Sequence, residues 1–107
     1  MIKVKYNRFY NRVTVQGHAE SAPKGEDLVC SAASILVHTL AANVAHMEEA
    51  NIATQSMVDI KDGFAKISCK PIRGFENTVS STFQSVCVGF EIMADKFPDY
   101  ISFKIIG

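Results

Sequence analysis

Two long segments with helical spacing of apolar residues most constrain how this chain can fold. The first, residues 28–50, contains no glycine or proline, and the second, residues 75–96, ends before Pro98. Asp27, directly before the first segment, is a typical helix N-cap. We therefore predict two amphipathic helices, because apolar residues recur three and four positions apart in both segments: positions 29, 33, 36, 37, 40, 44 and 47 in the first, and Val79, Phe83, Val86, Phe90 and Met93 in the second.

Short segments with alternating apolar and polar residues surround the two helices. Such alternation predicts half-buried strands, and it occurs at residues 2–7, around Val13 and Val15, and at residues 54–61, 64–70 and 100–106. In the third strand, Ser56, Val58 and Ile60 are expected on one face, and Asp62-Gly63 predicts a tight hairpin after it. The order β-β-α-β-β-α-β predicts an α+β fold, a two-layer sandwich of a mostly antiparallel sheet and two helices. We expect one domain over residues 1–107, since no linker divides the chain.

The charge balance limits the classes of partner. Lys+Arg and Asp+Glu number 11 each, which gives a formal net charge of +0. A dedicated nucleic-acid-binding protein usually carries a basic excess, so we expect no direct contact with nucleic acid. One basic cluster is nevertheless present, and it is either a solvated face or a weak contact to a polyanion or the ribosome: Lys3, Lys5, Arg8 and Arg12.

The cysteines and the apolar runs exclude further classes of protein. Cys30, Cys69 and Cys87 have no CxxC spacing, which argues against a disulfide framework and a structural zinc site. We expect no metal and no cofactor. No apolar run approaches the ~20 residues that span a bilayer, and no clear targeting segment is visible. The sequence therefore predicts a cytoplasmic protein without membrane contact.

Cys30 and His18 are the residues best placed for chemistry. Cys30 falls in the first turn of the first helix, near free backbone N–H groups and the positive end of the helix dipole, and both favour the thiolate. His18 precedes it in a glycine-containing loop, residues 17–26, that can bring the imidazole to the thiol. The histidine would then act as general acid for a leaving amine, and the helix N–H groups could bind an oxyanion.

Each of these residues also has a purely structural interpretation. A cysteine at a helix start is often a small buried residue, and a loop histidine often has a satisfied hydrogen bond. Asp27 is a plain cap by default, with a third catalytic role left open. His38 and His46 are expected on the surface of the first helix. Cys69 and Cys87 are expected in the core or at its margin.

Two stretches of sequence resemble a known signature. Gly17-His18-Ala19, followed after a short loop by Gly25-Glu26-Asp27-Leu28-Val29-Cys30-Ser31-Ala32-Ala33-Ser34, is similar to the pattern G-H-A…G-x-D-[IL]-V-C-[AS]-A-x-S. That pattern is typical of the ribosomal-processing cysteine protease family (Prp). The order of elements agrees with this family, so the resemblance extends over the whole chain.

The resemblance implies an endopeptidase and the roles of its residues. Such a protease removes the N-terminal extension of bacterial large-subunit ribosomal protein twenty-seven. Cys30 would be the nucleophile and His18 its partner in a Cys-His dyad, with four supporting positions: Gly17, Gly25, Asp27 and Ser34. The family also implies a homodimer and a mobile loop, residues 19–25, that closes over the cleft.

Two rival functions stay open at this point. The first is a non-catalytic ribosome-associated assembly or RNA-binding module that uses the basic cluster. The second is a redox or metal sensor that uses Cys30, although no second cysteine lies near it in the sequence.

Overall fold

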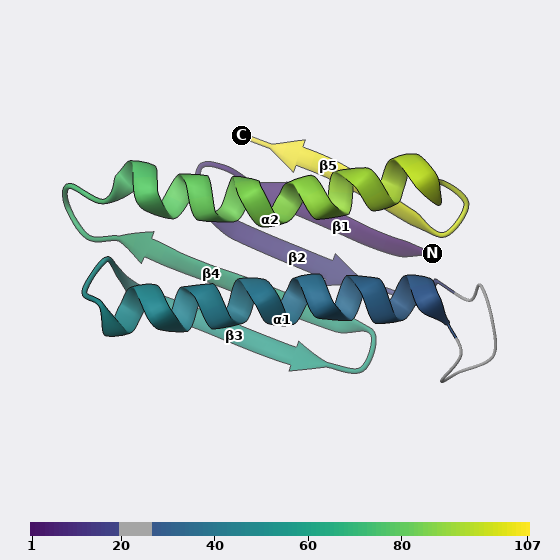
Figure 1. Cartoon of the computed structure of the whole chain (residues 1–107), viewed down its shortest axis with the longest axis horizontal. Helices are drawn as coiled ribbons and strands as arrows, with labels where there is room; N and C mark the ends of the chain where they lie inside the picture. Colours follow the sequence, from purple (N-terminus) through teal and green to yellow (C-terminus); the bar gives the residue numbers. More distant parts are fainter. Residues whose placement is uncertain (20–26) are drawn as a thin grey trace.

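The sheet and the helices form two layers in a computed structural model that describes residues 1–19 and 27–107. Both helices lie side by side on one face of the five-stranded sheet (Figure 1). The order of elements is the predicted β-β-α-β-β-α-β, with these bounds: β1 Ile2–Asn7, β2 Arg12–Gln16, α1 Leu28–Glu49, β3 Ala53–Lys61, β4 Phe64–Pro71, α2 Glu76–Lys96 and β5 Ile101–Ile106.

The strands lie in the order β3-β4-β2-β1-β5. Three neighbouring pairs are antiparallel, and β1 pairs with β5 in parallel, which confirms the prediction of a mostly antiparallel sheet. Pairing of Gln16 with Phe64 sets the end of β2 beside the start of β4. The residues that follow β2 therefore meet the turn that precedes β4.

The core lies between the two layers and uses the predicted apolar positions. The helical stripes face the sheet, and Leu40, Val44, Phe83 and Phe90 are fully buried. Tyr6 of β1 stacks on Phe83, with ring centroids 6.3 Å apart. Burial of these large side chains is the main stabilising contribution, at roughly 1.5–3 kcal/mol for each.

Strand β3, at one edge of the sheet, is more exposed than its alternation suggests. Val58 and Ile60 face the helix side of the sheet, as predicted, but 48% and 39% of their surfaces remain exposed because β3 lies at the edge of the sheet. Ser56 lies within an irregularity of the β3–β4 pairing, next to Gln55 with its positive φ of 50°. A bulge of this kind interrupts strict alternation. The Ser56 hydroxyl nevertheless donates to the carboxylate of Glu48 on α1 at 2.6 Å, so Ser56 lies on the same face as Val58 and Ile60, as predicted.

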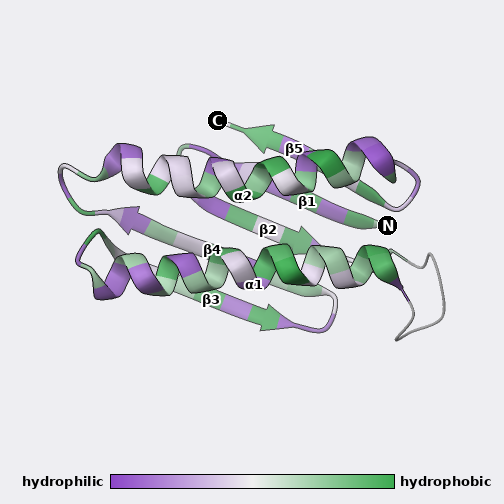
Figure 2. Ribbon diagram, in the orientation of Figure 1, coloured by the Kyte–Doolittle hydropathy of each residue, from purple (hydrophilic) through white to green (hydrophobic). Residues whose placement is uncertain are grey.

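The first helix also corrects one expectation about apolar runs. By length and composition alone α1 could cross a membrane, since an 18-residue window in it reaches a mean hydropathy of 1.7. Figure 2 shows apolar residues along much of this helix. The core helix of a water-soluble fold passes the same test, and the buried stripe of α1 packs against the sheet.

Candidate active site

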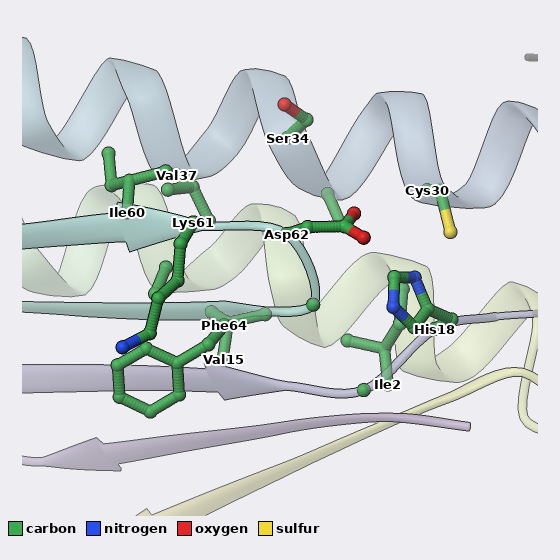
Figure 3. A pocket seen from close by; sticks show the side chains of 14 residues that line it. Ile2, Val15, His18, Cys30, Ser34, Val37, Ile60, Lys61, Asp62 and Phe64 are labelled. Atoms are coloured by element: carbon green, nitrogen blue, oxygen red, sulfur yellow. The ribbon is translucent and has the colours of Figure 1, made fainter.

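A pocket of about 310 Å³ opens between the first half of α1 and the β3–β4 hairpin. Its walls come from four parts of the chain: β1, the end of β2, α1 and the hairpin. Cys30 and His18 both line it, and Figure 3 shows the sulfur of Cys30 directed from the helix toward the side where His18 lies. The fold thus brings together the two residues that the sequence singled out.

The start of α1 holds Cys30 in place. The Asp27 carboxylate accepts a hydrogen bond from the backbone N–H of Cys30, at 3.0 Å, which confirms Asp27 as the N-cap. Asp27 is buried, whereas Cys30 is half-buried and reaches the pocket. The backbone N–H of Ala19 points at the sulfur, with a nitrogen–sulfur distance of 3.4 Å. The sulfur therefore lies between the start of α1 and the backbone of the segment after β2.

The same contacts change the expected set of oxyanion donors. The N–H of Cys30 is engaged by the Asp27 side chain, and the N–H of Ser31 donates to the Asp27 carbonyl at 3.1 Å. These two helix amides are therefore already hydrogen-bonded. The Ala19 amide already points at the sulfur, and it is better placed to donate to an oxygen that forms on a carbon bonded to that sulfur.

Gly17 fixes the path of the chain into His18. Its φ of 104° favours glycine, and a Cβ at this position would lie 2.3 Å from the backbone oxygen of Met1. The Gly17 N–H donates to the carbonyl of Gly63 at 2.9 Å, so the segment after β2 is tied to the β3–β4 turn. Gly17 therefore holds the segment that carries His18 against the β3–β4 turn.

Gly63 provides the surface on which the imidazole lies. A Cβ on Gly63 would be 2.7 Å from Nε2 of His18, and the φ of Gly63 is 71°. The glycine thus serves both the hairpin turn and the close approach of the His18 ring. Sequence reasoning assigned only the turn to Gly63, because local spacing does not show which distant segment a hairpin will meet.

The remaining expected site residues divide into those inside and those outside the described structure. Ser34 lies one helical turn after Cys30 and lines the same pocket. Gly25 and most of the expected mobile loop lie outside the described residues. The hairpin adds a residue that the sequence did not single out: the carboxylate of Asp62 also faces the pocket (Figure 3).

The other thiols and imidazoles lie apart from the pocket. Cys69 and Cys87 are buried in the core, where desolvation raises their pKa values to about 11 and about 12. His38 and His46 are exposed on α1, as predicted. Within residues 1–19 and 27–107, no group of three or more His, Cys, Asp or Glu residues is arranged to hold a metal ion.

A half-buried thiol and an imidazole that share a pocket beside a helix start are the elements of a cysteine hydrolase. The chain belongs to the family described as cysteine protease Prp, because the sequence model of that family matches residues 1–102. This protein is therefore a cysteine protease. No curated protein matches the sequence significantly.

Solved structures share the fold along nearly the whole chain. One is an essential ribosomal processing protease Prp from S. aureus in complex with a covalently linked product peptide, with a TM-score of 0.75, 20% identity, and coverage of 98% of this chain and 99% of the other. The same protease with a substrate peptide gives a TM-score of 0.68 at 18% identity, with the same coverage. SMU.848 from Streptococcus mutans gives 0.67 at 27% identity, covering 98% of this chain and 91% of the other.

Proposed function

We propose that this protease removes the N-terminal extension of bacterial large-subunit ribosomal protein twenty-seven, with Cys30 as nucleophile and His18 as general acid and base. The observation that carries the proposal is the meeting of Cys30, in the first turn of α1, and His18, after the end of β2, in one pocket. The ribosomal substrate is supported by the sequence signature and by the S. aureus structures, whose protein is a ribosomal processing protease.

The chemistry follows the usual two steps of a cysteine protease. The Cys30 thiolate attacks the carbonyl carbon of the scissile peptide bond, and the Ala19 amide, 3.4 Å from the sulfur, donates to the oxyanion. The C–N bond then breaks, and the protonated His18 imidazole gives its proton to the leaving amine. In the second step the neutral His18 takes a proton from water, whose oxygen attacks the thioester carbon. The C–S bond then breaks, which releases the new carboxylic acid, ionised in water to the carboxylate, and restores the Cys30 thiolate and the protonated His18.

The substrate peptide is proposed to lie along β3. This strand is at the edge of the sheet, and Ile60 and Lys61 near its end line the pocket. An edge strand offers unpaired backbone N–H and C=O groups to an extended peptide. Ile2, Val15 and Val37 give the pocket an apolar wall that suits an apolar side chain of the substrate.

The proposed working form is a homodimer in the cytoplasm. Apolar side chains of α2 and β5 remain exposed on the side of the molecule opposite β3, among them Val88 at 52%, Ile92 at 50% and Ile105 at 47%. Neighbouring exposed apolar groups of this kind are typical of subunit contacts. Sedimentation equilibrium tests the dimer, and a monomer at micromolar concentration would contradict it.

A cleavage assay tests the protease proposal. The substrate is a peptide that spans the N-terminal extension of ribosomal protein twenty-seven from the same organism, and mass spectrometry identifies the products. Wild type is expected to cut it once. Cys30→Ala and His18→Ala are each expected to lose that cut, with rate losses of at least ~10²-fold.

Matched variants separate chemistry from folding. His38→Ala removes an exposed imidazole from α1, and Cys69→Ala removes a core thiol. Both are expected to keep the cut. A folded wild-type protein that leaves the peptide intact contradicts the substrate, whereas a cut that survives Cys30→Ala contradicts the dyad. Reversible oxidation of Cys30 without any cleavage would favour the sensor alternative.

A further inference from the structure

The face of the sheet that points away from the helices carries an uneven distribution of charge. Both helices pack on the other face, so this one has no second layer within the described residues (Figure 1). The strand registers arrange its side chains in three rows that cross all five strands: Lys61, Phe64, Gln16, Lys3 and Ser102 in the first row; Asp59, Lys66, Thr14, Lys5 and Lys104 in the second; and Met57, Ser68, Arg12, Asn7 and Ile106 in the third.

These rows, which we call the open face, are strongly basic. They hold one carboxylate, Asp59, and six cations: Lys3, Lys5, Arg12, Lys61, Lys66 and Lys104. The whole chain has equal numbers of basic and acidic residues, 11 each. The fold therefore separates charges that the sequence balances, and the composition alone conceals a positive surface.

The cations of the open face are poorly neutralised by the protein itself. Lys61 and Asp59 form the ion pair of this face, at 4.0 Å, and both side chains are largely exposed. Such exposed pairs contribute little stability. No other salt bridge is formed by the lysines and arginines within residues 1–19 and 27–107. The remaining charges of the face are thus available to an external anion.

Aromatic rings accompany the cations. Phe64 lies on the open face, and the Lys61 ammonium sits 5.2 Å from the centre of its ring. At the β1–β2 turn Phe9 and Tyr10 are 79% and 54% exposed. Arg12 lies 5.1 Å from the centre of the Tyr10 ring. Exposed rings on a basic sheet are what single-stranded nucleic acids use: phosphates contact the cations, and bases stack on the rings.

We propose that the open face binds single-stranded RNA. The inference goes beyond the proteolytic function and replaces the sequence-based expectation of no nucleic-acid contact. It also explains how the two surfaces relate, because Lys61 and Phe64 belong to the open face and line the active-site pocket as well. A ribosomal protein that is bound to the same RNA would then be held near the active-site pocket, which contains Cys30.

The test measures binding by fluorescence anisotropy with a labelled single-stranded RNA of about 12 nucleotides of mixed sequence. Cys30→Ala protein serves as the parent, so the result does not depend on peptidase activity. Lys5→Gln/Lys66→Gln removes two charges from the central row, and Arg73→Gln/Lys96→Gln removes two exposed charges elsewhere. Each protein is titrated over a series of KCl concentrations.

The open-face double variant is expected to bind roughly tenfold more weakly than its parent. Its slope of log affinity against log salt should be less steep by about 1.4, since each phosphate contact on a single strand contributes about 0.7. The control double variant should keep the parent slope. The same substitutions in the active protein should leave cleavage of the short peptide unchanged, which shows that the fold is intact.

Three outcomes would overturn the proposal. In the first, the parent protein fails to bind the RNA at low salt. In the second, the control double variant loses as much affinity as the open-face variant. In the third, vesicles of phosphatidylcholine with phosphatidylserine, or a polyglutamate peptide, bind more tightly than the RNA and respond to Lys5→Gln/Lys66→Gln. A protein that binds RNA but does not cut the ribosomal peptide would contradict the proteolytic substrate and leave this inference standing.

Discussion

Replacement of Gly63 by alanine tests whether the position of the His18 ring controls activity. The new Cβ would lie 2.7 Å from Nε2 and 3.2 Å from Cε1 of His18, whereas ordinary contact begins at 3.4 Å. The ring must therefore move by about 0.7 Å from its present place. Because a misplacement of about 1 Å can reduce rates by about 10²-fold, we expect kcat/KM for the peptide to fall roughly ten- to a hundredfold.

The same substitution also strains the backbone, and this effect needs its own control. A φ of 71° disfavours any residue with a Cβ, at a cost of about 1–2 kcal/mol in the free energy of unfolding. Gly74 offers a matched position, because its φ is 98° and a Cβ there would meet no atom within 4 Å. Gly74→Ala should lose similar stability in urea unfolding and keep full activity.

A third variant separates strain from contact more sharply. Asparagine tolerates a left-handed backbone better than alanine, yet it still carries a Cβ. Gly63→Asn is therefore expected to recover part of the lost stability without recovering activity. Wild-type kcat/KM in Gly63→Ala, or an equal loss of activity in Gly74→Ala, would show that the contact with the His18 ring does not control the reaction.

Three further predictions follow from the same structure. Gly17→Ala should lower the stability of the protein more than Gly74→Ala does, since the new Cβ at position 17 would lie 2.3 Å from the backbone oxygen of Met1. Thermal unfolding should therefore show the larger fall in Tm for Gly17→Ala. Asp27→Ala removes the cap on the Cys30 amide and should lower the free energy of unfolding by about 1 kcal/mol, measured in urea, together with a loss of kcat. Iodoacetamide at neutral pH should modify only Cys30 in the native protein, because burial raises the pKa of Cys69 to about 11 and of Cys87 to about 12 and keeps both thiols protonated. Mass spectrometry of the digest identifies the modified thiol, and modification of Cys69 before Cys30 would contradict the prediction.

The helices and the core were predictable because their signals are local. Apolar spacing marked 28–50 as a helix, and the structure has Leu28–Glu49. The buried face of each helix follows from the same spacing, and the residue type of Asp27, directly before the first helix, indicates the cap. Cys30 could be placed at the helix start for the same reason, since a cap fixes the first turn that follows it.

The surroundings of His18 were not predictable, because they depend on strand order. Nothing near Asp62-Gly63 in the sequence indicates that β4 pairs with β2. That pairing sets Gln16 beside Phe64 and thereby brings the hairpin turn to the residues after β2. The open face was hidden for a similar reason: its charges come from all five strands, and only the registers collect them on one surface.

The hydrogen bond from the Gly17 amide to the Gly63 carbonyl joins two chain segments at the margin of the pocket, the residues after β2 and the β3–β4 turn, and both glycines are half-buried. Local openings of such segments occur at lower free energy than global unfolding. Because Cys30 lies on a long helix packed on the core and His18 lies on the segment after β2, we expect the His18 segment to open locally at the lower free energy. Mild heat or denaturant should inactivate the enzyme reversibly before its helices melt, and hydrogen exchange at the Gly17 amide would report the fraction of molecules that are catalytically intact.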